Sequence, residues 1–261
     1  MNIAAPVNHQ RSVGNIVLTV GAQGLRRLRE AGAAKVRIPH GSQEAILINT
    51  GGGLAGGDSF AFEIAAEAGA SLTVTTQAAE RVYRSLGPPA RVDVKLKAEA
   101  GAALYWLPQE SILFDGSSLS RSIEADLAAD ACFLAVESII LGREAMGETV
   151  AHASLRDRWR VRREGRLIFA DDLAFDGPPP ATIATLGDAR AFATILLIDA
   201  DAEALVEPVR GLIGDTGSAS AWSGKLVARL AARDGFDLRK ALIPALTLLA
   251  RSTPLPKVWS L

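Results

Sequence analysis

A short sequence pattern that occurs three times constrains the possible fold of this chain more than any other feature. AEAGASLTVTTQ begins at residue 66, AEAGAALYWLPQ at residue 98, and a weaker copy, LAADACFLAVES, at residue 127, so the intervals are 32 and 29 residues. Each copy is a small-residue turn followed by a strand-like segment that ends in polar residues. Units of about 30 residues that cannot bury their own face stack on their neighbours. We therefore predict a mainly β superhelix of stacked strand layers.

Period-2 alternation supports this prediction over the first two thirds of the chain. SFAFEIAAE places Phe60, Phe62 and Ile64 on one face of a strand. RWRVRREGRLIFADDLAF predicts a hairpin that turns near Glu164 and Gly165. The expected architecture is therefore strand joined to strand, with helices appearing late.

Two helices are expected in the C-terminal part. Residues 201–214 predict a short helix that Pro208 begins or kinks. Residues 237–251 predict a longer helix with a leucine stripe, capped by Asp234 or Asp237.

The glycine loop NTGGGLAGGDSF, residues 49–60, raises a competing hypothesis. Gly51, Gly53 and Gly56 fit the G-x-G-x-x-G spacing of dinucleotide-binding loops, and an apolar run precedes them. That fingerprint requires a helix after the glycines, because the helix N-terminus holds the pyrophosphate. Here DSFAFEI follows, which alternates like a strand. The favoured interpretation is a strand-to-strand connection whose glycines permit positive φ, with Asp58 at its rim.

Composition narrows the function classes. A formal net charge of −1 gives no electrostatic footprint for nucleic acid or an acidic membrane. No apolar run approaches the roughly 18 residues that a membrane span needs, and the N-terminus does not resemble a secretory signal. We expect one cytoplasmic domain over residues 1–261, with residues 1–12 flexible. The single cysteine, Cys132, is expected to be a buried, unreactive thiol.

Recognised catalytic and metal patterns are absent from the sequence. His9, His40 and His152 are scattered without metal-site spacing. Asp171 and Asp172 are neighbours in a predicted strand, so their side chains should point to opposite faces. The sequence therefore argues against an enzyme.

Several segments, taken in order, resemble one family. GGGLAGGD is followed by TTQAAERVYRS, WLPQESILFDGSSLSR, ESIILGREAMGE and the terminal PLPKVWSL. LPQESILFDG and GREAMGE in register with the others are the most specific. Over roughly residues 13–261 the chain resembles the urease accessory protein UreD family, called UreH in some organisms.

This resemblance implies a non-enzymatic maturation chaperone. It implies direct binding to UreF, contact with the GTPase UreG through UreF, and docking of the assembly on apo-urease. GTP hydrolysis is then coupled to nickel delivery and assembly of the dinuclear nickel centre. The resemblance also implies a mostly β superhelical fold with two helices, and an internal tunnel that carries nickel. No cofactor is expected to bind stably, and Ni²⁺ is expected only in transit.

Residues for such a nickel path should bind the ion weakly, so carboxylates, amides and hydroxyls suit it better than thiolates. We predict that the ends of the repeated strands line the path, because equivalent repeat positions stack. The candidates, with one residue added from the glycine loop, are Asp58, Gln77, Gln109, Glu110, Asp115 and Glu137. Turn formation or a solvated strand edge is the competing explanation for each.

A partner surface is predicted on the C-terminal helix. Its apolar residues either form a core or contact UreF, and the candidates are Leu238, Leu242, Ile243, Leu246 and Leu249. Asp171, Asp172 and the arginine-rich segment 156–166 are a further candidate surface, toward urease.

Two enzyme hypotheses stay open beside the resemblance. A β-solenoid carbohydrate-active enzyme would need two carboxyl groups roughly 5–10 Å apart on a concave face. A nucleotide-dependent oxidoreductase would use the glycine loop at residues 51–56.

Overall fold

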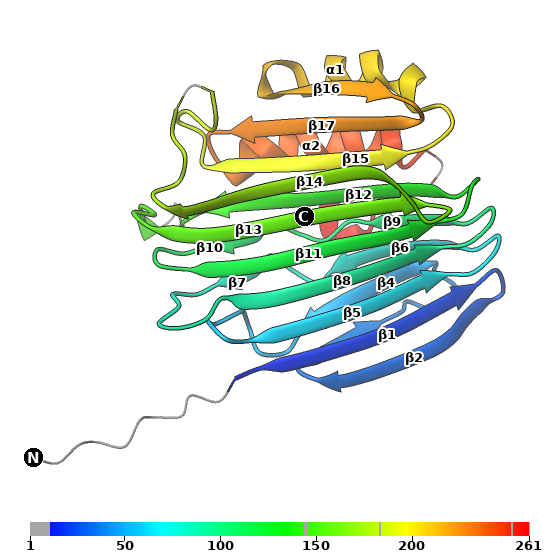
Figure 1. Ribbon diagram of the computed structural model, residues 1–261, viewed down its shortest axis with the longest axis horizontal. Coiled ribbons are helices and arrows are strands. Elements are labelled where there is room, and N and C mark those ends of the chain that lie inside the picture. Colours follow the sequence, from blue (N-terminus) through cyan, green and yellow to red (C-terminus); the bar gives the residue numbers. More distant parts are fainter. Residues whose placement is uncertain (1–10, 144–145, 183, 252, 261) are drawn as a thin grey trace, which may run out of the picture.

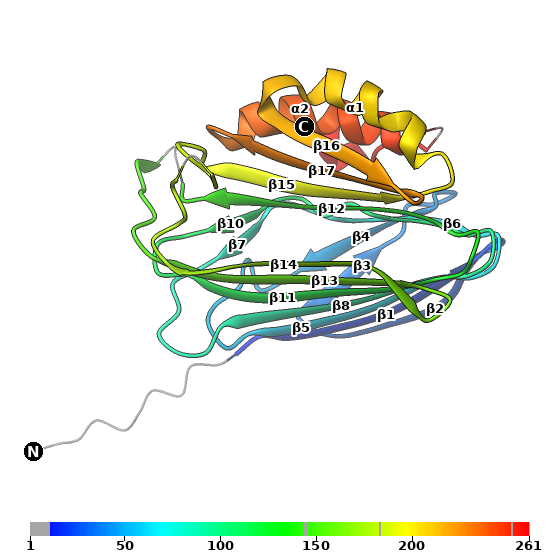
Figure 2. The same cartoon turned by 45° about the horizontal axis from the view of Figure 1, so that its top comes forward.

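The strands of the chain form two sheets that face each other, with helices on the outer side of one sheet (Figures 1 and 2). This computed structural model describes residues 11–143, 146–182, 184–251 and 253–260 of the 261. The flexibility predicted for residues 1–12 falls mostly on residues 1–10, which lie outside this set. Within the described residues, no helix has the length and apolar character that a membrane crossing requires.

Sheet A is the seven-stranded sheet on the side away from the helices. In spatial order it contains β14 (Arg166–Gly177), β13 (Ala153–Arg163), β11 (Ser118–Leu127), β8 (Ala90–Ala98), β5 (Ser59–Ala66), β1 (Val13–Gly21) and β2 (Gly24–Gly32).

Sheet B is the ten-stranded sheet between sheet A and the helices. Its main path contains β16 (Gly217–Trp222), β17 (Lys225–Ala232), β15 (Ala191–Ile198), β12 (Cys132–Leu141), β9 (Ala103–Trp106), β6 (Ser71–Thr76), β4 (Glu44–Asn49) and β3 (Ala34–Arg37). Two short strands lie off that path, β7 (Glu80–Val82) and β10 (Ser111–Leu113).

The interval of the sequence repeat equals the offset between paired residues in the parallel strands of sheet B. β6 pairs with β9 in parallel, with Leu72 opposite Leu104, and β9 pairs with β12, with Leu104 opposite Phe133. These partners are 32 and 29 residues apart, the same intervals as between the repeat copies. The chain runs from sheet A into sheet B and back in each layer, as in β5–β6–β7 and β8–β9–β10. The predicted superhelix of stacked strand layers is confirmed.

The layers differ at one place in sheet B. In the first two layers a bend separates β6 from β7 and β9 from β10, at residues 77–79 and 107–110. In the third layer β12 is continuous, pairing with β9 through its first half and with β10 through Ile139 to Leu141. The bends open the sheet locally, and the candidate site lies beside this break.

Two hydrophobic cores hold the layers together. One lies between the sheets and includes Phe60, Ile123 and Trp159, and the other lies between sheet B and the helices and includes Leu238 and Trp259. Sheet B is therefore apolar on both faces where the helices cover it. This explains why β15 is buried at every residue and reads as a continuous apolar run without alternation.

The two predicted helices are present. α1 (Val206–Ile213) carries Pro208 in its first turn, where the missing N–H costs no helical hydrogen bond. α2 (Gly235–Leu249) begins two residues earlier than predicted, because the Asp234 carboxylate accepts a hydrogen bond from the Asp237 N–H at 2.8 Å. Asp234 is thus the cap, and Pro244 lies inside the helix.

The predicted hairpin is also confirmed. β13 and β14 pair antiparallel and are joined by Glu164 and Gly165, with φ of 49° and 74°. Two central residues with positive φ are typical of the tight turns that match the twist of paired strands.

Candidate functional site

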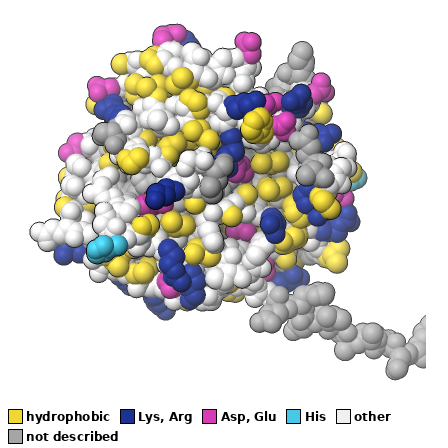
Figure 3. All heavy atoms as spheres, turned by 180° about the vertical axis from the view of Figure 1, so that it is seen from behind, with side chains coloured by type: hydrophobic (Ala, Val, Ile, Leu, Met, Phe, Trp, Pro, Cys, Tyr) yellow, Lys and Arg dark blue, Asp and Glu magenta, His cyan; other side chains and the backbone are white. Residues whose placement is uncertain are grey.

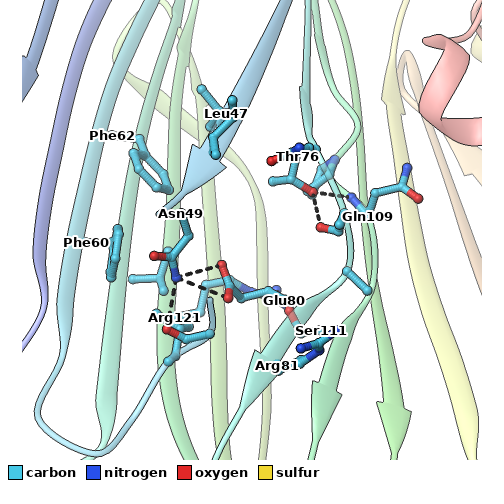
Figure 4. A pocket seen from close by; sticks show the side chains of 18 of the residues that line it. Leu47, Asn49, Phe60, Phe62, Thr76, Glu80, Arg81, Gln109, Ser111 and Arg121 are labelled. Carbon is cyan, nitrogen blue, oxygen red and sulfur yellow. Dashed lines mark hydrogen bonds between the residues drawn. The ribbon is translucent and has the colours of Figure 1, made fainter. Parts of the chain in front are cut away.

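A cavity of about 320 Å³ lies between the two sheets at the break in sheet B (Figure 4). Its apolar walls include Leu47, Phe60, Phe62, Val92 and Trp106. Its polar lining residues are Asn49, Thr76, Gln77, Glu80, Arg81, Gln109, Ser111, Arg121 and Glu137. Residues from three superhelical layers thus meet in one space.

The glycine loop forms part of the rim of this cavity. It joins β4 to β5, so no helix follows the glycines and the dinucleotide fingerprint does not apply. Gly53 has φ of 146°, and a Cβ there would lie 2.3 Å from Cε2 of Tyr83. The interpretation of the loop as a close-packed connection between strands is confirmed.

A buried charge cluster closes the inner end of the cavity. Arg121 on β11 donates to Glu137 on β12, and its Nη2 lies 2.6 Å from Oδ2 of Asp157 on β13. The indole N–H of Trp106 donates to Glu137 at 2.9 Å, and that of Trp159 donates to Asp157 at 3.2 Å. One arginine therefore ties a sheet B carboxylate to a sheet A carboxylate.

Burial sets the protonation of this cluster. Glu137 is only 4% exposed, and burial raises its pKa to about 7, against the opposing effect of Arg121 and with a further increase from Asp157. Two carboxylates share one guanidinium, so the cluster carries excess negative charge when both are ionised. Burial thus disfavours the charged form of Glu137, and Arg121 partly offsets this effect.

Glu80 is the second carboxyl group on the cavity, and it is held differently. It is half-buried, and its two oxygens lie 3.2 and 3.3 Å from the single amide nitrogen of Asn49. Burial raises its pKa to about 7, and the Asn49 hydrogen bond and the charge of Arg81 oppose this only in part. Glu80 was not among the residues predicted from the sequence.

Of the six predicted path residues, the structure brings three to the cavity. Gln77, Gln109 and Glu137 all line it. Glu110, by contrast, does not line the cavity, and its carboxylate pairs with Arg239 of α2 at 3.0 Å. Gln77 and Gln109 occupy equivalent positions in the repeat, whereas Glu137 lies one residue before the third such position.

The other two predicted residues stabilise loops. The Asp58 carboxylate is buried, and it accepts hydrogen bonds from the N–H groups of Ser12 and Ala55, both at 2.8 Å. Asp58, predicted at the rim of the glycine loop, is thus buried beneath that loop and holds its backbone. Asp115 pairs with Arg84 at 2.6 Å and accepts from the N–H of His152 at 3.1 Å.

Behind the break, the polar groups continue toward the helices. Arg239 of α2 donates to Oε1 of Gln109 at 3.0 Å and stacks on Trp259, with 5.3 Å from its guanidinium carbon to the ring centroid. Gln109 Nε2, Ser138 Oγ and Arg239 Nε are buried without a hydrogen-bond partner among the described residues. Buried polar atoms of this kind are ordinarily hydrated.

The predicted partner residues on α2 mostly face inward. Leu238, Leu242, Leu246 and Leu249 are buried in the core against sheet B, and only Ile243 is half-buried. A partner that docks on the surface cannot reach these four leucines. The same helix exposes Phe236 by 70%.

The predicted charged surface is divided in the same way. Asp172 pairs with Arg160 at 2.5 Å, whereas Asp171 pairs with Arg229 of β17 at 2.6 Å. The two neighbouring carboxylates thus point to opposite faces, as predicted, and only Asp172 belongs to the exposed outer face of sheet A.

The described residues contain no group of three or more histidine, cysteine, aspartate or glutamate side chains that could hold a metal ion. Cys132 is half-buried, and burial raises its pKa to about 12, so its thiol remains protonated at neutral pH.

Sequence reasoning missed Arg121 and Asp157, although a signal existed. Arg121 shares an inward face with Leu119 and Ile123, and Asp157 shares one with Leu155 and Trp159. A charged residue at an inward position of an alternating strand indicates a buried ion pair.

Comparisons with known proteins identify the family. The family model described as UreD urease accessory protein matches residues 13–260. The chain is 47% identical to the urease accessory protein UreD of Agrobacterium fabrum over 266 residues, covering 98% of this chain and 94% of that protein. It is 48% identical to the protein of that name from Rhizobium leguminosarum bv. trifolii over 272 residues, covering 100% of both. The chain belongs to the UreD urease accessory protein family.

Proposed function

We propose that this chain is a urease-maturation chaperone of the cytoplasm rather than an enzyme. It binds UreF directly and UreG through UreF, and the assembly docks on apo-urease. GTP hydrolysis by UreG supports delivery of nickel through this chain, with Ni²⁺ as cargo, and formation of the dinuclear nickel centre. The relatives' name, urease accessory protein, supports the biological setting. Neither the carbohydrate-active enzyme nor the oxidoreductase finds support in the family.

The observation that carries the proposal is the meeting of Gln77, Gln109 and Glu137 on one cavity. Amide and carboxylate oxygens bind Ni²⁺ less tightly than clustered imidazoles or thiolates, so they can pass an ion on. A carboxyl group with a pKa of about 7, as at Glu137, can also exchange a proton for a cation near neutral pH.

A route across both sheets follows from the lining residues. Arg121 lines the cavity and also a polar groove of about 530 Å³ on the outer face of sheet A, beside Asp93, Glu124 and Arg158. On the other side, Gln109 joins the cavity to Arg239 behind sheet B. In the proposal, nickel moves along this series of polar groups.

The proposed UreF surface is the outer side of the helical layer. Phe236 of α2 and Leu212 of α1 are 70% and 43% exposed, and Ile243 and Leu248 are half-buried. Figure 3 shows hydrophobic side chains gathered in the upper half of the face that carries the helices. Exposed apolar groups on a helical layer are typical of a protein interface. The outer face of sheet A, with Arg156, Arg158 and Arg160, is the proposed surface toward urease.

The first test measures urease matured with its other accessory proteins, with and without this chain. The expected result is that both nickel content and activity collapse without it. Equal maturation in both samples would reject the proposed function.

The second test uses a matched pair of substitutions. Glu137→Gln changes a carboxyl group on the cavity, and Glu110→Gln changes one that lies off it. We expect slower nickel incorporation for Glu137→Gln, with unchanged UreF binding, and a smaller effect for Glu110→Gln. Equal rates for Glu137→Gln and the unaltered protein would remove Glu137 from the path.

A further inference from the structure

We propose that the cavity between the sheets is also a binding site for an organic cation, an alkylammonium or alkylguanidinium group, with Glu80 as its counter-ion. This ligand class includes the lysine and arginine side chains of a partner and free amines. The inference goes beyond the proposed function, because it concerns a ligand other than nickel and is tested on this chain alone.

Glu80 has unused capacity to accept hydrogen bonds. A carboxylate offers about four acceptor positions. Among the side chains of the described residues its oxygens share one donor, the Asn49 amide nitrogen, at 3.2 and 3.3 Å, and the Arg81 backbone supplies a further hydrogen bond. None of the lysines and arginines in the described part of the chain forms an ion pair with it, although Arg81 is its neighbour in sequence. A half-buried carboxylate with these hydrogen bonds and no ion pair among the described residues is incompletely compensated.

The carboxylate is held in place by the glycine loop. The same Asn49 nitrogen donates to the Gly53 carbonyl at 3.0 Å, and the Asn49 side-chain oxygen accepts from the Gly51 N–H at 2.8 Å. Asn49 is therefore fixed by three polar groups of its own loop and of Glu80. Glu80 in turn is anchored through its backbone N–H, which donates to the Glu110 carbonyl at 2.8 Å. Figure 4 shows the Asn49 and Glu80 side chains meeting across the cavity.

Aromatic rings line the same cavity as this carboxylate. Phe60 and Phe62 have ring centroids 6.3 Å apart, and Phe62 and Trp106 have centroids 6.5 Å apart. All three line the cavity together with Leu47 and Val92. The faces of aromatic rings attract organic cations, and the aliphatic residues suit an alkyl stem. A carboxylate on such a cavity complements a positive charge carried on an apolar group.

A resident metal ion fits the Glu80 side of the cavity poorly. A divalent transition metal takes about four to six oxygen, nitrogen or sulfur ligands. Glu80 belongs to no group of three or more histidine, cysteine, aspartate or glutamate side chains in the described residues, and the cavity lining combines aromatic rings with Asn49 and Arg81. Glu137 also faces the cavity, but its carboxylate is occupied by Arg121 and Trp106. A carboxylate that has no ion-pair partner among the described residues, on a cavity that aromatic rings also line, therefore favours a monovalent organic cation.

The test is calorimetric titration of the full chain with n-butylammonium, n-butylguanidinium and the neutral isostere n-butylurea. We expect at least one of the two cations to bind at least tenfold more tightly than n-butylurea. Glu80→Gln should reduce that affinity at least tenfold, while Glu63→Gln, which removes an exposed carboxylate of β5, should not. Glutamine can keep the contact with Asn49, so this variant should fold, and its urea unfolding curve checks that it does.

Each other outcome of the titration overturns the inference. Equal binding of n-butylurea and the cations would make the space an apolar cavity only, and an unchanged Glu80→Gln variant would exclude the counter-ion. A second titration compares two extended peptides that differ at one position, lysine in one and norleucine in the other. It tests whether the bound cation comes from a partner's side chain or from a free amine. Preference for the lysine peptide over free amines indicates a partner side chain, and the reverse indicates a free amine. None of these results depends on whether urease is activated, so failure here and failure of the proposed function are distinguishable.

Discussion

Glu137 and Glu80 face the same cavity from the same sheet, and burial raises the pKa of each to about 7. Their surroundings differ in kind. Glu137 is enclosed by Arg121, Trp106 and the continuous strand β12, whereas Glu80 lies on a three-residue strand beside a glycine loop. The position in the superhelix explains this difference, because the first layers bend at residues 77–79 and the third does not.

Two carboxyl groups whose pKa values are raised to a similar extent can therefore have different roles. At Glu137 each carboxylate oxygen accepts one hydrogen bond, from Trp106 or Arg121, and the pair with Arg121 joins the two sheets, so its first role is structural. At Glu80 a half-buried carboxylate has hydrogen bonds from Asn49 and the Arg81 backbone but no ion-pair partner among the described residues, which costs stability unless a ligand completes it. Substitutions around the two carboxyl groups can separate a structural role at Glu137 from a ligand-binding role at Glu80.

The largest expected loss of stability comes from removing Arg121, the cation that Glu137 and Asp157 share. Arg121 is 5% exposed and contacts both Glu137 and Asp157. Arg121→Met leaves two buried carboxylates without a counter-ion, which should lower the free energy of unfolding by about 3–5 kcal/mol. Urea unfolding followed by tryptophan fluorescence measures it.

The matched control for that substitution is Arg91→Met. Arg91 is an exposed residue of β8 that pairs with Asp93 at 2.7 Å, and exposed pairs contribute about 0–1 kcal/mol. If both arginine variants lose the same small amount, the enclosed cluster is not a clamp between the sheets and the comparison fails.

An intermediate loss of stability is expected from a substitution in the glycine loop, which holds Asn49 against Glu80. Gly53→Ala places a Cβ 2.3 Å from the Tyr83 ring at a φ of 146°. Steric overlap and backbone strain should together lower the free energy of unfolding by about 1–3 kcal/mol. The control is Gly52→Ala, which has φ of 75° but no other atom within 4 Å of the added Cβ. Similar losses at both positions would show that backbone strain alone, and not contact with Tyr83, shapes the rim.

The sequence predicts the enclosed region better than the open one. The repeat intervals of 32 and 29 residues equal the offsets between paired strands, so the stacking of Gln77 and Gln109 follows from the repeat, whereas Glu137 lies one residue before the third equivalent position. Arg121 and Asp157 are detectable too, since each breaks the inward apolar face of an alternating strand.

The open region depends on contacts that no local pattern records. Glu80 meets Asn49, 31 residues earlier, only because the glycine loop turns back over β7. The α2 leucines illustrate the same limit, because a helical stripe shows that one face is buried but not whether this chain or a partner buries it. β15 has no periodicity to detect, since both of its faces are covered.

The smallest expected effect is the pH dependence of stability that Glu80 contributes. Its pKa is about 7 in the folded protein against 4.5 as the ordinary value, so the folded state holds a proton that the unfolded state releases between those pH values. Stability contributed by this group therefore falls as pH rises from about 5 to 8. Glu80→Gln removes this pH dependence. The free energy of unfolding of the variant minus that of the unaltered protein should therefore be about 1–2 kcal/mol larger at pH 8 than at pH 5. Urea unfolding at both pH values measures the difference, with Glu63→Gln as the control for loss of an exposed negative charge. A Glu80→Gln variant that parallels the unaltered protein at both pH values would mean that Glu80 is already compensated, and the contrast with Glu137 would disappear.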